Sequence, residues 1–112
     1  MFRPEIKVLD CSIRDGGLIN KWRFDDAFVR ATYRALNAAG VDYMELGYKA
    51  SPELFDPKDF GKWRFCRDED VKRLLDGEEM GTRLACMVDI GRVSEKDILP
   101  REQSPFAMIR VA

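Results

Sequence analysis

The stretch that decides the fold is Leu9-Asp10-Cys11-Ser12-Ile13-Arg14-Asp15-Gly16-Gly17, which follows the apolar residues Ile6 and Val8. The apolar residues predict a short buried strand over Ile6–Cys11, and the two glycines predict a turn that ends it. The Arg14-Asp15 pair would then lie at the carboxyl end of a strand, where parallel α/β proteins place their chemistry. From the residues alone, the pair could also be an ordinary solvated turn.

Strand and helix patterns alternate along the rest of the chain. Asp25 or Asp26 can cap a helix over Ala27–Ala39, in which apolar residues recur at helical spacing. The residues of this stripe are Phe28, Thr32, Ala35, Leu36 and Ala39. Further strands are expected at Val41–Leu46, which Gly47 ends, at Thr82–Ile90 and at Phe106–Val111, with a helix at Asp68–Asp76 and a short turn capped by Ser94. This alternation predicts an α/β fold with a parallel sheet.

A long polar segment, Tyr48–Arg67, separates the second expected strand from the helix that follows. It carries the aromatic residues Phe55, Phe60, Trp63 and Phe65. Connections are usually about 4–6 residues, and longer loops are often functional. The aromatic side chains could therefore cover a site as a lid, or pack beneath the loop onto neighbouring helices.

Four parallel strands cannot close into a barrel of eight, and a parallel strand at an open edge exposes apolar groups. We therefore expect residues 1–112 to be an N-terminal piece of something larger, or to close by association with another copy of the chain.

Composition excludes several classes of protein. The chain is 46% apolar and 35% charged, which is typical of a folded globular protein, and its 19 basic and 20 acidic residues nearly cancel. This balance favours neither nucleic acid nor an anionic membrane as a partner. No apolar run approaches the ~18 residues of a membrane span, and the N-terminus has no apolar signal core, so we expect a cytoplasmic protein.

Cysteine and histidine usage argues against a structural zinc site. The three cysteines, Cys11, Cys66 and Cys86, are far apart, and the sequence contains no histidine. We expect reduced, mostly buried thiols. Any complete metal site would need ligands from outside this stretch.

Charged residues recur at the expected carboxyl ends of the strands. They are Asp10, Arg14, Asp15, Glu45, Asp89 and Arg110. Asp15 is a hard oxygen ligand that suits Mg²⁺ or Mn²⁺, and Arg14 offers planar donors for an enolate or carboxylate oxygen. Together they suit chemistry that builds negative charge on the oxygen of a 2-oxo acid.

Each of the later residues also has a structural interpretation. Glu45 lies inside an apolar strand and needs a partner, which could be structural or functional. Asp89 could be a turn or capping residue, and Arg110 could belong to a structural ion pair.

The segment Val8–Gly17 resembles the signature of the DRE-TIM metallolyases, the superfamily that includes HMG-CoA lyase, whose first strand ends in D-x-T-L-R-D-G. Ser12 stands where that family usually has Thr, and Ile13 where it has Leu. Met44–Tyr48 looks like the second strand end of the family. Met108–Ala112 looks like the fourth strand of its 4-hydroxy-2-oxovalerate aldolase branch.

The resemblance implies the N-terminal portion, about four βα units, of a TIM (β/α)8 barrel that uses a divalent metal, Mn²⁺ or Mg²⁺. It implies Asp15 as a metal ligand and Arg14 as the residue that stabilises an enolate, with two histidines beyond residue 112 as further ligands. Reactions in the family make or break a carbon–carbon bond next to a carbonyl. The aldolase branch cleaves 4-hydroxy-2-oxo acids to pyruvate and an aldehyde.

One position departs from the aldolase pattern. Where the aldolases have a histidine four residues after the arginine, this chain has Leu18, which cannot move a proton. We predict Arg14 and Glu45 as catalytic residues, Asp15 as a metal ligand, and Asp89 and Arg110 as substrate-binding residues. The alternatives are an acyl-CoA-dependent Claisen synthase or lyase of the same superfamily, and a non-catalytic half-barrel that forms a homo-oligomer.

Overall fold

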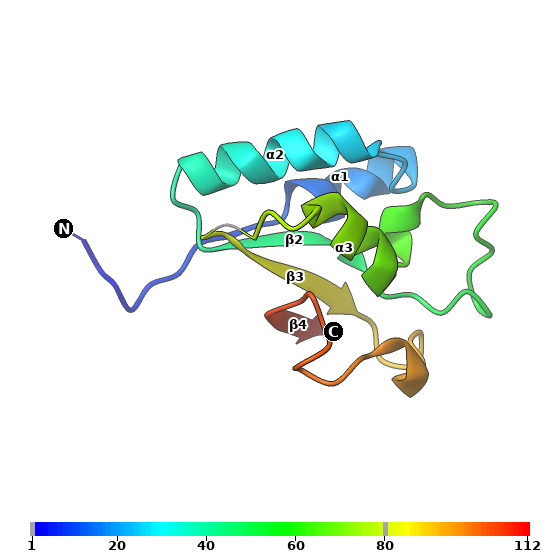
Figure 1. Cartoon of the computed structure of the whole chain (residues 1–112). Helices are drawn as coiled ribbons and strands as arrows, with labels where there is room; N and C mark the ends of the chain where they lie inside the picture. Colours follow the sequence, from blue (N-terminus) through cyan, green and yellow to red (C-terminus); the bar gives the residue numbers. More distant parts are fainter. Residues whose placement is uncertain (1, 80) are drawn as a thin grey trace.

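The computed structural model describes residues 2–79 and 81–112, and Met1 and Met80 lie outside the described residues. Four parallel strands form one sheet in the order β1-β2-β3-β4 (Figure 1). Their bounds are Leu9–Asp10 for β1, Tyr43–Tyr48 for β2, Arg83–Val88 for β3 and Met108–Val111 for β4. Because consecutive strands are neighbours and parallel, the predicted α/β fold is confirmed.

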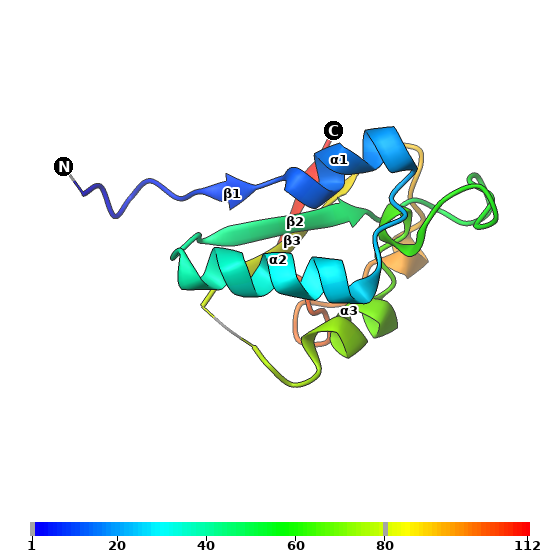
Figure 2. The ribbon, with the colours of Figure 1, turned by 90° about the horizontal axis from the view of Figure 1, so that it is seen from above.

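Three α-helices connect these strands within the described residues. They are α1 (Ser12–Asn20), α2 (Asp26–Ala38) and α3 (Asp68–Leu75). The connections also contain two short 3₁₀ helices, η1 (Lys62–Arg64) before α3 and η2 (Glu95–Asp97) between β3 and β4. Helices α2 and α3 lie on the same face of the sheet (Figure 1), whereas α1 continues from the end of β1 alongside β2 (Figure 2). No described helix is long and apolar enough to cross a lipid bilayer.

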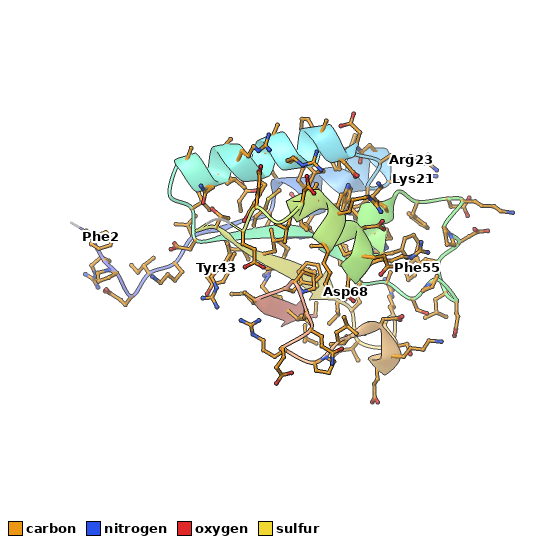
Figure 3. All side chains as sticks on the ribbon, in the orientation of Figure 1. Phe2, Lys21, Arg23, Tyr43, Phe55 and Asp68 are labelled. Carbon is orange, nitrogen blue, oxygen red and sulfur yellow. The ribbon has the colours of Figure 1, made fainter. Side chains whose placement is uncertain are left out.

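The first strand is shorter than the sequence predicts, and the two glycines do not form a turn. Strand β1 pairs with β2 only through Leu9 and Asp10, while Ile6 and Val8 are exposed. Phe2 lies on the N-terminal segment, which projects away from the sheet (Figure 3). Asp10 ends the strand, because its carboxylate accepts hydrogen bonds from the backbone N–H and the hydroxyl of Ser12 at 3.0 and 2.9 Å.

Gly16 and Gly17 lie inside helix α1, contrary to the prediction. A Cβ atom on Gly17 would lie 2.0 Å from a ring carbon of Trp22, so the indole packs directly on the helix backbone. The Trp22 Nε1–H also donates to the carbonyl of Arg14 at 2.8 Å. Glycine weakens a helix by roughly 1 kcal/mol per residue, and here the packing of the indole overrides that preference.

Helix α2 begins where the sequence predicts, but a different stripe faces the core. The Asp25 carboxylate caps the helix by accepting from the Phe28 N–H at 2.7 Å. Val29 and Tyr33 are the buried residues of α2. Phe28 is exposed and stacks on Phe24, with ring centroids 5.5 Å apart. The predicted stripe is therefore wrong by one position in its first two turns, where Val29 and Tyr33 replace Phe28 and Thr32, while Leu36 packs against the core as predicted.

The two faces of the sheet have different chemistry. Met44, Leu46, Leu84 and Cys86 belong to the apolar core, which also holds the buried residues of α2 and α3. Since successive side chains of a strand point to opposite faces, Glu45 faces away from this core. Glu45 pairs in register with Ala85 of β3, and Ala85 with Met108 of β4, so Arg110 lies on the same face as Glu45.

Strand β2 runs past Gly47, where the sequence predicts its end. A Cβ atom on Gly47 would lie 1.9 Å from the carbonyl oxygen of Trp63, so glycine is required by a close backbone approach rather than by a turn. The register of β2 against β3 shifts between Glu45 and Tyr48. Two residues four apart, Glu45 and Lys49, can therefore project to different sides of the sheet.

Most of the aromatic residues of the long loop pack inward. Trp63 is fully buried in the core and donates from its indole to the carbonyl of Phe24 at 3.0 Å, and Phe65 is also buried. The packing alternative is therefore confirmed for these two residues. Phe60 is half-buried and packs against the same core, and it also contacts Phe55 edge to face, with ring centroids 5.8 Å apart.

The last connection departs from the βα pattern in a way the sequence predicts. Residues 89–107, all of them described, join β3 to β4 and contain only the 3₁₀ helix η2. Ser94 is the N-cap of η2, as expected, and it forms a capping box in which its N–H donates to the Asp97 carboxylate at 3.3 Å. The outer side of β3 and β4 is therefore covered by a loop where a βα repeat normally places a helix.

Candidate functional site

The centre of the candidate site is the carboxylate of Glu45, which accepts hydrogen bonds from two arginines on different elements. Arg110 of β4 donates through Nε to Oε2 at 2.6 Å and through Nη2 to Oε1 at 2.7 Å. Arg14 of α1 donates through Nε to Oε1 at 2.8 Å. Residues 14, 45 and 110 are far apart in the chain, and the parallel sheet brings them together on the face away from α2 and α3.

Glu45 is held in its ionised form. Its side chain is fully buried, and burial raises the pKa of a carboxyl group. The hydrogen bonds from Arg110 and then Arg14 outweigh burial, so the pKa of Glu45 is lowered below its ordinary value. A carboxylate that accepts three charge-assisted hydrogen bonds is a poor proton carrier and a strong anchor. This geometry favours Glu45 as the residue that positions both guanidinium groups.

Helix α1 determines where Arg14 lies. The indole of Trp22 packs on Gly17 and binds the Arg14 carbonyl, which fixes the backbone of the first helical turn. The Arg14 side chain is only 18% exposed, and its pKa is raised because the bond to Glu45 outweighs burial. Arg14 therefore remains charged, with guanidinium N–H groups that also reach Asp15.

Arg110 is more open to solvent than Arg14. Its side chain is 38% exposed, and its Nη2 lies 3.9 Å from the Cys11 sulfur at the start of α1. Burial raises the pKa of the Cys11 thiol, so Cys11 stays a neutral neighbour. Arg110 was expected either to bind substrate or to belong to a structural ion pair. It forms an ion pair with Glu45, and that pair lies within the candidate site.

Asp15 fits a divalent metal as a single ligand. Its side chain is 67% exposed, and its Oδ1 accepts from Arg14 Nη1 at 3.1 Å. A carboxylate oxygen is a ligand that Mg²⁺ and Mn²⁺ accept, but these ions need several oxygen or nitrogen ligands. Among residues 2–79 and 81–112, no three His, Cys, Asp or Glu side chains cluster as a metal site.

Asp89 is placed apart from the three charged residues around Glu45. It follows the end of β3, where its carbonyl accepts from the Arg92 N–H at 3.0 Å and its carboxylate lies 3.8 Å from Arg92 Nη1. These contacts correspond to the turn interpretation. Leu18 lies on α1 and is 68% exposed, with no proton-carrying group in its side chain.

The sequence analysis did not predict that Arg64 is buried. The residue is only 6% exposed, and its Nε has no hydrogen-bond partner among the described residues. Its guanidinium instead lies within 4.3 to 5.9 Å of four aromatic rings. These rings belong to Trp22, Tyr48, Phe55 and Phe60. Burial lowers the pKa of Arg64, and the negative charge of Asp89 opposes that effect only in part.

The sequence analysis also missed a buried ion pair between Lys49 and Asp68. Lys49 is 3% exposed, and its Nζ donates to Asp68 Oδ2 at 3.2 Å and to the Cys66 carbonyl at 3.0 Å. A lysine just after an apolar strand, followed by an acidic helix start, is the only sequence signal of this pair. That signal is weak, because exposed lysines occur at strand ends too.

Comparisons with known proteins give one informative match. No protein-family model matches the chain, and no curated protein matches it. A solved structure described as the "N-terminal domain of a putative aldolase" from Bacteroides vulgatus matches with a TM-score of 0.77 and 28% sequence identity. The match covers 95% of this chain and 35% of the other, so this chain spans about a third of the length of the solved structure. The chain is therefore similar, over nearly all its residues, to the N-terminal domain of that protein, with which it shares the α/β fold.

Proposed function

We propose that this chain forms the first four strands of a (β/α)8 barrel enzyme, an aldolase or lyase that cleaves a carbon–carbon bond next to the carbonyl of a 2-oxo acid. The observation that carries the proposal is the Glu45 carboxylate of β2, which binds Arg14 of α1, the helix that follows β1, and Arg110 of β4 on one face of the parallel sheet. The similarity to an N-terminal domain that is named for an aldolase supports it. So does the resemblance of Val8–Gly17 to the DRE-TIM signature.

Arg14 has the central chemical role in this proposal. When a 4-hydroxy-2-oxo acid loses its hydroxyl proton, the bond between C3 and C4 breaks and its electron pair forms an enolate. The aldehyde leaves, and protonation of the enolate at C3 gives pyruvate. The Arg14 guanidinium would hydrogen-bond the enolate oxygen as charge develops there. Glu45 would hold that guanidinium in place, so little reorganisation accompanies the reaction.

Asp15 would contribute one ligand to a divalent Mn²⁺ or Mg²⁺ ion, with the other ligands supplied by the remainder of the barrel. Such an ion, when bound, polarises the substrate carbonyl. Arg110 would bind the substrate carboxylate with the guanidinium edge that Glu45 leaves open. Leu18 leaves proton transfer to another group. We place Asp89 at the mouth of the barrel, at the end of β3, where it could contact the distal part of a substrate.

The test is an assay of the full-length protein that contains this chain. With Mn²⁺ present, we expect pyruvate release from at least one 4-hydroxy-2-oxo acid, followed by coupled NADH oxidation. Arg14→Lys should lower kcat by about 100-fold or more, since lysine lacks the planar donors. Arg34→Lys, at an exposed ion pair on α2, should leave kcat unchanged.

Turnover of no such acid together with no bound metal would refute this proposal. The Claisen alternative is tested by incubating the same protein with an acyl-CoA and a 2-oxo acid. It predicts release of free CoA in that assay and no pyruvate from 4-hydroxy-2-oxo acids. That result would keep the enolate chemistry and change the substrate.

A second candidate function is a non-catalytic half-barrel that associates with itself. The specific observation that favours it is an apolar groove of about 320 Å³ between α1 and α2, beside the exposed side chains of Ile19 and Phe28. Sedimentation velocity on the chain distinguishes the candidates, because a dimer without metal-dependent turnover would support association.

A further inference from the structure

Arg64 is a buried cation to which the proposed reaction assigns no role. The residue is 6% exposed, and its guanidinium group donates no hydrogen bond and forms no ion pair with any residue that the structure describes. The four aromatic rings around it attract the charge through their faces, but they offer its N–H groups no oxygen acceptor. A buried charge normally has such a partner, so the guanidinium group of Arg64 is available to bind an anion.

The guanidinium group of Arg64 is open along one edge. Its Nε atom is enclosed and has no partner among the described residues. Nη1 and Nη2 have no described partner either, but they are not enclosed, so the accessible part of the side chain includes these two groups. Two N–H donors on one edge of a guanidinium group match the two oxygens of a carboxylate. The open edge therefore fits one carboxylate that approaches end-on.

The charges around Arg64 also favour a single anion. The titratable groups that act on it are Asp89, Tyr48 and Arg92. Asp89 would repel an anion, but its carboxylate lies 3.8 Å from Arg92 Nη1 and is shared with that cation. Tyr48 contributes the face of its ring, 4.4 Å from the guanidinium carbon. The two arginines and Asp89 together leave one positive charge in excess, which one carboxylate would balance.

Arg64 lies at the carboxyl end of the sheet, as the Glu45 site does. Figure 2 shows β2 pointing toward the long loop. Tyr48 is the last residue of β2, three residues after Glu45, which corresponds to about 10 Å along a strand. Trp22 contacts both sites, because its indole donates to the Arg14 carbonyl and its ring lies 4.9 Å from the Arg64 guanidinium carbon. A five-carbon chain with a carboxylate at each end, and a hydrogen bond of about 2.8 Å at each carboxylate, is long enough to bridge this separation.

We propose that Arg64 binds a second carboxylate of the substrate, so that the substrate is a dicarboxylic 4-hydroxy-2-oxo acid. The inference rests on the proposed function, which places the 2-oxo acid end of the substrate at Arg14 and Arg110. In 4-hydroxy-2-oxoglutarate, loss of the hydroxyl proton and cleavage of the bond between C3 and C4 releases glyoxylate. The electron pair of that bond forms the enolate, and its protonation at C3 gives pyruvate. Arg64 holds the carboxylate of the part that leaves.

The first experiment measures binding and needs no turnover. Isothermal titration of the full-length protein with Mn²⁺ compares 2-oxoglutarate with 2-oxopentanoate, which has a methyl group in place of the second carboxylate. Both acids lack the 4-hydroxyl group, so neither is cleaved. We expect 2-oxoglutarate to bind at least about tenfold more tightly. Arg64→Met, which keeps an unbranched side chain between the rings and removes the charge, should bring the ratio of the two affinities close to one.

Two further variants assign this preference to Arg64. Arg23→Met is the matched control, because Arg23 is an exposed arginine at the same end of the molecule (Figure 3) and donates only to the Lys58 carbonyl among the described residues. It should leave the ratio of affinities unchanged. Asp89→Asn removes the opposing charge and leaves the rings in place, so it should raise the affinity for 2-oxoglutarate relative to 2-oxopentanoate about threefold or more. This variant decides the question if Arg64→Met does not fold.

Turnover separates the inference from the proposed function. In the pyruvate assay, kcat/KM should be at least about tenfold higher for 4-hydroxy-2-oxoglutarate than for 4-hydroxy-2-oxovalerate, and Arg64→Met should remove the difference. Equal values for the two acids in wild type, or a 2-oxoglutarate preference that Arg64→Met retains, would overturn the inference and leave the aldolase proposal standing. Cleavage of neither acid, with a 2-oxoglutarate preference that depends on Arg64, would refute the reaction and support the carboxylate site.

Discussion

At the scale of single residues, Glu45 has the largest energetic role that the structure reveals. It is a fully buried carboxylate with two cationic partners, and removing one member of such a group leaves uncompensated charge in the interior. The exposed ion pairs of the molecule, such as Lys96 with Glu53, make the same kind of bond but remain hydrated.

Glu45→Gln should therefore lower the free energy of unfolding by about 3 kcal/mol or more, because Arg14 and Arg110 lose their shared counter-charge. Urea unfolding at neutral pH measures the loss. Glu53→Gln is the matched control at an exposed pair and should change stability by less than about 1 kcal/mol. An equal effect of the two substitutions would contradict the role we assign to Glu45.

The same carboxylate should make stability depend on pH. The pKa of Glu45 is lower in the folded protein than its ordinary value of 4.5, so its contribution is fully present above the pKa of the unfolded chain. It is lost as the pH falls through the folded-state pKa, which lies below that value. In urea unfolding from pH 6 down to about pH 3, the difference in stability between wild type and Glu45→Gln should shrink as the pH falls below 4.5. A constant difference across this range would show that Glu45 is not the group that titrates.

At the scale of elements, helix α1 is the part of the structure that the sequence pattern predicts least well. Two adjacent glycines normally end a helix or strand, yet here both lie within the helix. The indole of Trp22 occupies the space that a side chain at position 17 would fill, and position 16 has more room. The glycines therefore serve packing and not chain reversal.

Gly17→Ala should destabilise the protein by about 2 kcal/mol, although alanine is the better helix former, because its Cβ would overlap the Trp22 ring. Gly16→Ala in the same helix is the control. Its Cβ would lie 3.2 Å from a Phe24 ring atom, so we expect a much smaller change. Thermal or urea unfolding compares the two variants. If Gly17→Ala were as stable as Gly16→Ala, the indole would not define the helix.

At the scale of the whole molecule, one side of the sheet is covered and large apolar groups remain exposed elsewhere. Ile19 is 92% exposed and Phe28 is 53% exposed, and both line the groove between α1 and α2. Adjacent apolar side chains of this size commonly mark an interaction surface. In the proposed barrel, another part of the same protein would cover them.

We expect residues 1–112 on their own to associate through this groove. Sedimentation velocity at increasing concentration should show a dimer or larger species, and Ile19→Glu should shift it toward monomer. Leu54→Glu, at an exposed apolar residue of the long loop, is the control and should have no effect. A monomer at all concentrations would mean that the groove needs no partner.

The sequence by itself determined the features that arise from local interactions. These include the order of the four strands with α2 and α3, a carboxylate cap of α2 at Asp25 or Asp26, the start of α3 at Asp68, and the cap of η2 at Ser94. Each depends on a hydrogen bond or an apolar spacing within one turn, so a pattern of neighbouring residues is enough to predict it. The same patterns identified Glu45 as a carboxylate that needed a partner.

Only the tertiary structure decided which residues from distant parts of the chain come into contact. It turned Arg14-Asp15-Gly16-Gly17 from a turn into a helix, because Trp22 packs on position 17. It joined Glu45 to Arg14 and Arg110, since strand pairing brings distant positions into register. A shift of that register placed Lys49 opposite Asp68. Such contacts depend on packing between elements, and no spacing within a single element encodes them.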